Sequence, residues 1–465
     1  MARSAIRNGE VSFWMQRDNE HVNYPQFEGT STYDLVIVGG GLTGLWAAYY
    51  AKKLEPSLEI AVLEAEIIGY GASGRNGGWL SALVPGNRKK YATAPGSSTQ
   101  SCRAFQREMI STVDEVLNVC RQEHIDADQV KGGNLAVATT VAGLNRLKTR
   151  RGADLRYGFD EDEVELLDAS QISQRVRVAG VHGGLYYPNV ARIDPAKLVR
   201  QLGRVIRKLG VDVFEGSRVL SIDGEVLLTA AGHINSRYRL ICTEGYSGPL
   251  VGDRRLIPVN SSMIVTQPLS DTDWSRIGWN GMECLSDAAH TFIYAQRTVD
   301  GRIAIGGRGS PYRFASGTGG RGETSASTVT LLHNKLQILF PEAKFVVDHA
   351  WSGVLGVTRD WCASINFDRS TGTGSALGYA GHGVTATNLA GRTLADQVLG
   401  IDSELTKLPW VGYKTRNWEP EPIRWLGVHA MYRLFGVADS WEESRHSTKT
   451  SLIAKLGSRL AGLHE

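Results

Sequence analysis

A glycine pattern directly after a short apolar run constrains the fold of this chain more than any other feature. Residues 34–38 predict a buried parallel strand, and Gly39, Gly41 and Gly44 follow it in the spacing G-x-G-x-x-G. In this pattern the first glycine permits a sharp turn and the second lets a pyrophosphate approach the backbone. The third lets the next helix pack closely on the strand. The pattern therefore predicts a helix over residues 42–53 whose N-terminal amides face phosphates.

A second strand and an acidic residue complete this unit. Residues 60–63 are apolar and predict a strand that leads directly into Glu64. A carboxylate at this point accepts hydrogen bonds from ribose hydroxyls and repels a 2′-phosphate, which disfavours NADP. The alternative is a glycine turn in some other α/β protein, but it does not explain why all these parts occur together.

Two further glycine-rich segments lie far from the first. Residues 69–78 contain five glycines, and residues 379–385 contain Gly381 and Gly383 before an expected helix over 386–399. Backbone amides in such loops bind phosphate or a planar polar ring. NAD proteins do not usually need these parts, whereas a reduced flavin carries negative charge that a helix N-terminus stabilises. The three segments together predict a flavin nucleotide site.

Composition excludes several other classes of protein. The 465 residues include 51 Lys and Arg against 48 Asp and Glu, and this net charge of +3 is too small to indicate a nucleic-acid partner. The five cysteines are scattered without metal-ligand spacing, so we expect reduced thiols, no metal and a cytoplasmic protein. The N-terminus lacks the apolar run of a signal peptide, and we expect no membrane span.

The order of elements predicts an α/β (α+β) protein with two domains. We expect a Rossmann-like FAD-binding domain and a second, substrate domain built on a mixed, largely antiparallel sheet. The FAD-binding domain is expected at 31–100, 185–250 and 350–400, and the substrate domain at 101–184 and 251–349. Residues 1–30 form an N-terminal extension and 401–465 a C-terminal helical extension in this scheme.

The three glycine segments, in this order and spacing, resemble the FAD-dependent oxidoreductases of the D-amino-acid oxidase and glycine/sarcosine oxidase superfamily. Residues 71–78 and 381–384 are most similar to gamma-glutamylputrescine oxidoreductase-like members. The resemblance covers roughly residues 10–400. It implies hydride transfer from a carbon–nitrogen bond to flavin N5, followed by hydrolysis of the imine to an aldehyde and an amine or ammonia.

The resemblance also implies a set of cofactor residues. The first segment would hold the pyrophosphate, Glu64 the ribose and the main chain at Val219 the adenine. The second segment would line the phosphate and flavin path, and the third would face the pyrimidine edge of the ring. The expected FAD residues are Gly39, Gly41, Leu42, Thr43, Gly44, Glu64, Ala65, Ser73, Gly74, Arg75, Asn76, Gly77, Gly78, Val219, Gly353, Gly381, His382, Gly383 and Val384.

Departures from the family pattern sharpen these expectations. Relatives with covalent flavin carry a Cys near Gly353 or a His in the glycine loop, so we expect non-covalent FAD here. Glycine-oxidase-like members have a carboxylate-binding Arg where this chain has Val354-Leu355, which disfavours a simple α-amino acid. Sarcosine oxidases place a Lys over N5 to activate oxygen, and the corresponding position in this chain is near Ala304, so another carrier is a candidate electron acceptor beside oxygen.

His382, Trp351, Trp79 and Tyr294 are the candidate catalytic residues. The two tryptophans would form aromatic walls that attract an amine, and the alternative for both is an ordinary core position. His382 tunes the ring or orients substrate in one interpretation and is a structural hydrogen-bonding residue in the other. Arg308, Arg313 and Arg359 could bind an anionic substrate tail, although most arginines are simply solvated. No general base is required if a neutral amine transfers hydride directly.

The functional hypothesis is oxidation of a primary or secondary amine with a polar tail, such as a gamma-glutamyl amine. The alternatives are an amino acid or aminophosphonate oxidoreductase, a Rossmann enzyme that uses NAD, and a flavoprotein with a binding or assembly role. In the C-terminal extension, Trp425, Val428, Tyr432 and Phe435 share one helical face. We expect this face to dock on the protein itself and to make no membrane contact, and the alternative is an interfacial membrane helix.

Overall fold

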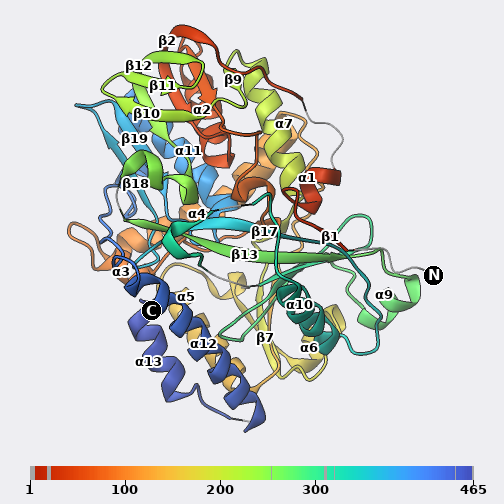
Figure 1. Ribbon diagram of the computed structural model, residues 1–465. Coiled ribbons are helices and arrows are strands. Elements are labelled where there is room, and N and C mark those ends of the chain that lie inside the picture. Colours follow the sequence, from red (N-terminus) through yellow and green to blue (C-terminus); the bar gives the residue numbers. More distant parts are fainter. Residues whose placement is uncertain are drawn as a thin grey trace.

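The computed structural model describes residues 6–17, 22–252, 254–307, 312–318, 320–445 and 447–462. It contains two large sheets with helices packed around them, shown in Figure 1. The predicted α/β class with a Rossmann-like part and a mixed second sheet is confirmed.

The first sheet has eight strands and carries the first glycine pattern. At its centre β2 (Gly29–Val38) pairs in parallel with β3 (Ile60–Leu63) and β12 (Gly232–Ile241). The apolar end of β2 is fully buried: helices cover the face that carries Leu35 and Ile37, and residues of other strands, with Phe27, cover the face that carries Val36 and Val38. The other strands are β9 (Asp212–Phe214), β10 (Val219–Asp223), β11 (Val226–Thr229), β18 (Ser364–Asp368) and β19 (Thr373–Leu377).

Several helices share one core with this sheet. The predicted nucleotide helix is α2 (Leu42–Leu54), and it packs on α11 (Gly383–Leu399) and α7 (Pro195–Lys208). Helix α11 begins three residues earlier than expected, directly within the third glycine segment. Helix α4 (Thr99–Gln122) packs against α11 and buries its apolar face in the same core.

The second sheet has nine strands, and most of its pairs are antiparallel. Its order is β1 (Arg7–Asn8), β17 (Val347–Thr358), β13 (Leu256–Thr266), β16 (Ile303–Gly307), β15 (Tyr294–Arg297), β14 (Cys284–Asp287), β5 (Asn134–Ala138), β7 (Gly183–Tyr187) and β6 (Glu165–Asp168). Its helices are α5 (Val141–Arg156), α6 (Ala169–Arg175), α9 (Asp271–Ile277) and α10 (Ala326–Leu339). The domain ranges stay a prediction, but residues 185–187 of β7 and 350–358 of β17, which fall in the expected FAD-binding ranges, belong to strands of this sheet.

The remaining elements are short or C-terminal. Helices α12 (Ile423–Ser444) and α13 (Leu452–Ala461) form a hairpin at the lower end of the molecule in Figure 1. None of the helices in the described ranges combines the length and the apolar character that crossing a membrane requires. The short elements are α1 (Phe13–Arg17), η1 (Ala72–Gly74), β4 (Trp79–Leu80), α3 (Arg88–Ala92), η2 (Glu161–Glu163), β8 (Ala191–Arg192), η3 (Glu244–Tyr246), α8 (Gly248–Val251), η4 (Phe314–Ser316) and η5 (Glu404–Lys407).

Candidate flavin site

The first glycine segment forms the sharp strand-to-helix turn that its pattern predicts. Gly39 has φ of 112°, and a side chain there would place its Cβ 2.7 Å from the Cys242 carbonyl oxygen. A Cβ on Gly44 would collide with the carbonyl oxygen of Gly39. Both positions therefore require glycine for the turn and for close packing of α2 on β2.

The second segment lies against the start of α2. The Leu42 amide donates a hydrogen bond to Ser73 Oγ at 2.8 Å, and a Cβ on Gly41 would lie 3.0 Å from the same oxygen. The N-terminal amides of α2, with the positive end of the helix dipole, thus face the loop that contains Ser73. The structure brings these two segments together, as the sequence predicts.

Glu64 lies beside the glycine turn and is partly buried. Its carboxylate accepts hydrogen bonds from the amides of Gly40 at 2.7 Å and Glu66 at 2.9 Å. Burial raises the pKa of Glu64 to about 7, although these two hydrogen bonds oppose the shift. Ala65 follows Glu64, and Val219 packs with Val38 in the same part of the sheet. The ribose and adenine roles of Glu64, Ala65 and Val219 remain predictions.

Side chains of the second segment hold its own backbone. Asn76 accepts a hydrogen bond from the Gly78 amide at 2.7 Å and donates to the Ser73 carbonyl at 2.8 Å. Arg75 donates from Nε to the Tyr70 carbonyl at 2.7 Å, and its guanidinium lies over the Tyr70 ring. The conformation of this loop is therefore supported by hydrogen bonds from its own side chains.

The third segment contacts the helix that follows the first segment, and it lies near β17. Tyr379 OH lies 3.1 Å from Thr43 Oγ1 on α2, and both groups are buried. Gly381 has φ of 107°, and a Cβ there would lie 4.0 Å from Leu355 of β17. The His382 amide donates to the Tyr379 carbonyl at 3.0 Å, and α11 starts at the next residue, Gly383.

These surroundings fit FAD. Among the buried donors of the described residues that have no hydrogen-bond partner, three lie in or directly beside the second and third glycine segments: Arg75 Nη2, Trp79 Nε1 and Thr385 Oγ1. An unpaired buried polar group costs about 1–3 kcal/mol, so such groups usually have a partner that completes them. Arg75 belongs to the second glycine segment, Trp79 directly follows it, and Thr385 lies in the first turn of α11. Two helix N-termini and these donors suit an anionic, polar cofactor.

The candidate catalytic residues fall into different surroundings. Trp79 and Tyr294 contact each other edge to face, with ring centroids 6.2 Å apart. Tyr294 OH lies 2.8 Å from Ser261 Oγ on β13, and its ring covers Gly77 and Gly306 so closely that neither could carry a side chain. These contacts place Trp79, Tyr294 and Ser261 where the second glycine segment meets the nine-stranded sheet.

Trp351 lies in a closed aromatic cluster. It is fully buried against Phe13 and Trp14 of α1, and its Nε1 donates to the Arg75 carbonyl at 2.9 Å. The geometry therefore favours the core interpretation of Trp351 over an aromatic wall exposed to substrate. Its neighbour on the strand, Gly353, faces Arg75, where a Cβ would lie 3.0 Å from the Arg75 Cβ.

The arginine candidates for a substrate tail receive little support. Arg359 pairs with Glu419 at 3.1 Å, and its guanidinium lies over the Trp418 ring. Arg308 lies outside the described residues. Arg313 lies just before η4 and has further interactions of its own.

Sequence reasoning missed two residues that organise the site. Gln296 of β15 donates from Nε2 to the Gly77 carbonyl at 2.7 Å. Glu244 follows the carboxyl end of β12, and its carboxylate accepts hydrogen bonds from the amides of Gly378 at 2.8 Å and Tyr379 at 3.2 Å. Burial raises the pKa of Glu244 to about 7, opposed by these amides and that of Gly356. The sequence signal for Glu244 is its position just after the carboxyl end of a parallel strand, since ligands bind at that edge of such a sheet.

Comparison with known proteins identifies the class to which this fold and site belong. The model of the DAO family, described as FAD dependent oxidoreductase, matches residues 34–397, from the start of the glycine pattern almost to the end of α11. The chain therefore belongs to this family of FAD-dependent oxidoreductases. FAD is its cofactor, and helices α12 and α13 lie beyond the matched residues.

Individual relatives support the same family. The chain is 30% identical over 397 residues to gamma-glutamylputrescine oxidoreductase of Escherichia coli K12, covering 84% of this chain and 89% of that protein. It is 24% identical to glycine oxidase of Bacillus licheniformis, over 79% of this chain and 93% of that protein. The crystal structure of glycine oxidase from Geobacillus kaustophilus has a similar fold, with a TM-score of 0.67 at 20% identity over 80% of this chain and 96% of that one.

Proposed function

We propose that this enzyme oxidises the carbon–nitrogen bond of a primary or secondary amine that carries a polar tail, such as a gamma-glutamyl amine. The observation that carries the proposal is the corner formed by Trp79, Tyr294 and Ser261 beside the glycine segments. The relationship to gamma-glutamylputrescine oxidoreductase supports this substrate class. Bound FAD would supply a two-electron acceptor for the hydride of the amine α-carbon, and water would hydrolyse the resulting imine.

The corner favours an amine in its neutral form. Removal from bulk water disfavours the ammonium ion and lowers the pKa of a bound amine. The neutral form is the one that can release hydride, because its nitrogen lone pair stabilises the developing cation. In this proposal the Tyr294 and Ser261 hydroxyls hold the amine nitrogen by hydrogen bonds, and Trp79 limits its position.

Two positions support further parts of the proposal. Position 353 is a glycine packed closely on Arg75, so it offers no cysteine for a covalent link, which supports non-covalent FAD. Sarcosine oxidases carry the lysine that activates oxygen near the position of Ala304. In this chain Ala304 is fully buried with Met263 and Trp351, and it provides no amine for this role. We therefore propose that a carrier other than oxygen accepts the electrons. The five cysteines are free and buried, which is compatible with a reducing cytoplasm.

An anaerobic reduction assay tests the proposal. Purified flavoprotein is mixed without oxygen with gamma-glutamylputrescine, putrescine, glycine, sarcosine and aminomethylphosphonate, and the flavin absorbance is followed. We expect loss of the oxidised flavin spectrum with the gamma-glutamyl amine. Reduction by glycine or aminomethylphosphonate alone would support the amino acid or aminophosphonate alternative. Reduction by none of a wider amine panel would support a binding role.

A further inference from the structure

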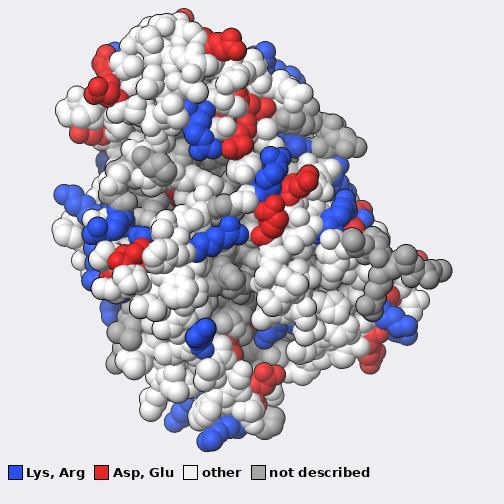
Figure 2. Space-filling view, viewed as in Figure 1, with Lys and Arg blue, Asp and Glu red and all other residues white. Residues whose placement is uncertain are grey.

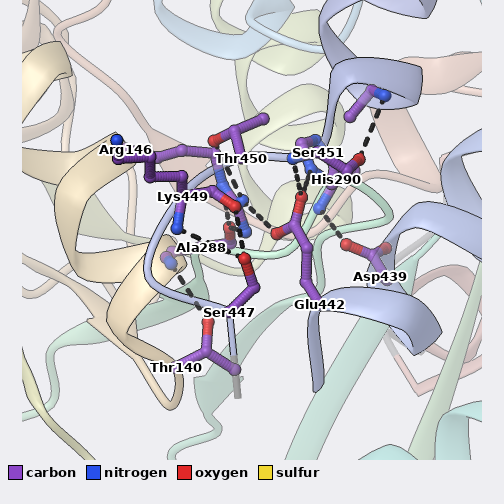
Figure 3. Close-up of polar contacts among 12 residues, drawn as sticks. Thr140, Arg146, Ala288, His290, Asp439, Glu442, Ser447, Lys449, Thr450 and Ser451 are labelled. Atoms are coloured by element: carbon purple, nitrogen blue, oxygen red, sulfur yellow. Dashed lines mark hydrogen bonds and ion pairs between the residues drawn. The ribbon is translucent and has the colours of Figure 1, made fainter. Parts of the chain in front are cut away.

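The C-terminal hairpin has an inner face that is fixed to the rest of the protein. Glu442 of α12 binds Arg146 at 2.5 Å and His290 Nε2 at 3.0 Å, as Figure 3 shows. Asp439, one turn earlier, accepts hydrogen bonds from the amides of His290 at 2.8 Å and Thr291 at 2.9 Å. These contacts set the rotation of α12 about its axis. The helix therefore cannot turn its opposite face inward.

The inner face contains the apolar side chains that the sequence predicts to dock. Val428 and Phe435 are buried, and Trp425 and Tyr432 pack beside Val428 in a cluster that includes Ala380 of the third glycine segment. The predicted docking of this face is confirmed. The expectation of no membrane contact considered this face alone.

A second apolar stripe lies on the outer face of α12. It consists of Ile423, Leu426, Val437 and Trp441, whose spacing puts them on one side of the helix. Helix α13 packs antiparallel to α12, with Gly457 against Leu434, and exposes Leu452, Ile453 and Leu456. Each of these seven exposed side chains keeps between 40% and 82% of its surface accessible. A shallow groove on the same side of α12 is lined by Arg433, Gly436, Val437, Ser440, Trp441 and Ser444.

Charge on this hairpin is strongly one-sided. Among its described side chains, Arg433, Arg445, Lys449 and Lys455 are exposed, against the single exposed acid Glu443. This local excess equals the net charge of +3 of the entire chain. Arg445 also lies over the Trp441 ring, 5.2 Å from its centroid. In Figure 2 the lower end of the molecule, where the hairpin lies, is mostly uncharged, with Lys or Arg at its base.

We propose that the outer face of α12 and α13 binds the surface of an anionic lipid bilayer. Exposed apolar side chains enter the boundary between headgroups and acyl chains, Trp441 lies at the headgroup level, and the cations pair with lipid phosphates. Solvent exposure of this much apolar surface otherwise carries a cost in solubility. A second copy of the chain is a poorer occupant, because a twofold contact would bring the same cations face to face.

Vesicle co-sedimentation of the full-length protein tests the proposal. The probes are vesicles of phosphatidylcholine with phosphatidylglycerol, and vesicles of phosphatidylcholine alone. We expect binding to the anionic vesicles that weakens as salt rises and is much lower on the neutral ones. Lys449→Gln and Lys455→Gln should each weaken binding about fivefold, the effect of one cation near an anionic surface.

Apolar variants separate insertion from simple charge attraction. Val437→Ser with Leu452→Ser should weaken binding at least tenfold, because both side chains lose their contact with the acyl boundary. Leu220→Ser is the matched control, since Leu220 is similarly exposed on β10 at the opposite end of the molecule, and it should bind as the parent does. Circular dichroism checks that each variant is folded.

Three results would overturn the proposal. The first is no sedimentation with anionic vesicles at low salt. The second is equal binding by the parent and the Val437→Ser, Leu452→Ser variant. The third is a parent protein that light scattering shows to be a dimer and that Val437→Ser with Leu452→Ser makes monomeric. The outer face would then be a contact between two copies of the chain.

Discussion

Glu244 accepts a hydrogen bond from the Gly378 amide at 2.8 Å, and this contact joins the end of β12 to the loop that leads into α11. The second carboxylate oxygen accepts from the Tyr379 amide at 3.2 Å. One side chain thus fixes the direction in which the third glycine segment leaves the sheet. It also lies against Gly356 of β17, where a Cβ would come within 2.9 Å of the carboxyl carbon.

The first prediction is that Glu244→Gln lowers stability by about 1–3 kcal/mol, because both oxygens of the Glu244 carboxyl group, protonated or not, can accept from an amide, whereas the nitrogen of a Gln side chain cannot accept. Urea unfolding followed by circular dichroism measures the change. Glu225→Gln, which alters an exposed residue of the β10–β11 turn, is the control and should unfold as the parent does. An unchanged midpoint in Glu244→Gln would show that the carboxylate does not hold the loop.

The second prediction concerns pH. The folded-state pKa of Glu244 is raised from 4.5 to about 7 by burial, so the folded protein favours the protonated acid. The stability that this group contributes is present below pH 4.5 and is lost as pH rises to about 7. Glu64 is shifted in the same direction and over the same range. The stability difference between parent and Glu244→Gln should therefore shrink as pH rises over this range, and a difference that grows would contradict the prediction.

The third prediction tests the first glycine segment. Gly41→Val adds a branched side chain where Ser73 Oγ approaches the start of α2, so the pyrophosphate loses its access to the backbone. We expect at least a tenfold loss of bound FAD per chain, measured by absorbance after purification. Gly152→Val is a suitable control because nothing lies within 4 Å of that position on α5. Full flavin content in the Gly41 variant would disprove the assignment.

The fourth prediction concerns attachment of the flavin. Acid precipitation of the purified protein should leave FAD in the supernatant, because glycine occupies position 353 against Arg75. The readout is the ratio of flavin in supernatant and pellet. Flavin that stays with the pellet would reveal a covalent link to another residue.

The fifth prediction separates the candidate catalytic residues. Tyr294→Phe removes the hydroxyl that meets Ser261 and should slow anaerobic flavin reduction by about tenfold, the equivalent of ~1.4 kcal/mol, with FAD content unchanged. Trp351→Phe keeps an aromatic ring in the buried cluster, so it should lower thermal stability while the pH dependence of reduction stays that of the parent. A shifted pH dependence in Trp351→Phe would return this residue to the substrate site.

Local patterns explain which parts could be predicted from the sequence. The turn at Gly39 and the extent of α2 follow from spacing over a dozen residues, because sterics at each glycine act within the turn itself. The fold class follows from the order of the predicted strands and helices along the chain. The meeting of the three glycine segments follows from the general rule that ligands bind at the carboxyl ends of parallel strands.

Other features depend on contacts between distant residues and left no local signal. Trp351 is removed from solvent by Phe13 and Trp14, which belong to an N-terminal segment whose path only the tertiary structure reveals. Gln296 holds the Gly77 carbonyl from a strand far along the chain. The sequence does not single out the outer stripe of α12, because the inner stripe already accounts for the apolar face expected of a docked helix. The contacts of Glu442 show which side of the helix faces inward and so separate the two stripes.

Strand β17 has a consequence for how substrate reaches the flavin. It pairs with β13 along almost its whole length, while Trp351 and Gly353 touch Arg75 and Gly356 touches Glu244. The same strand therefore belongs to the nine-stranded sheet and also supports the loops that surround the cofactor. A rotation of one sheet away from the other would break all of these contacts at once. Substrate is then admitted by movements of single side chains and surface loops, while the two sheets keep their relative position.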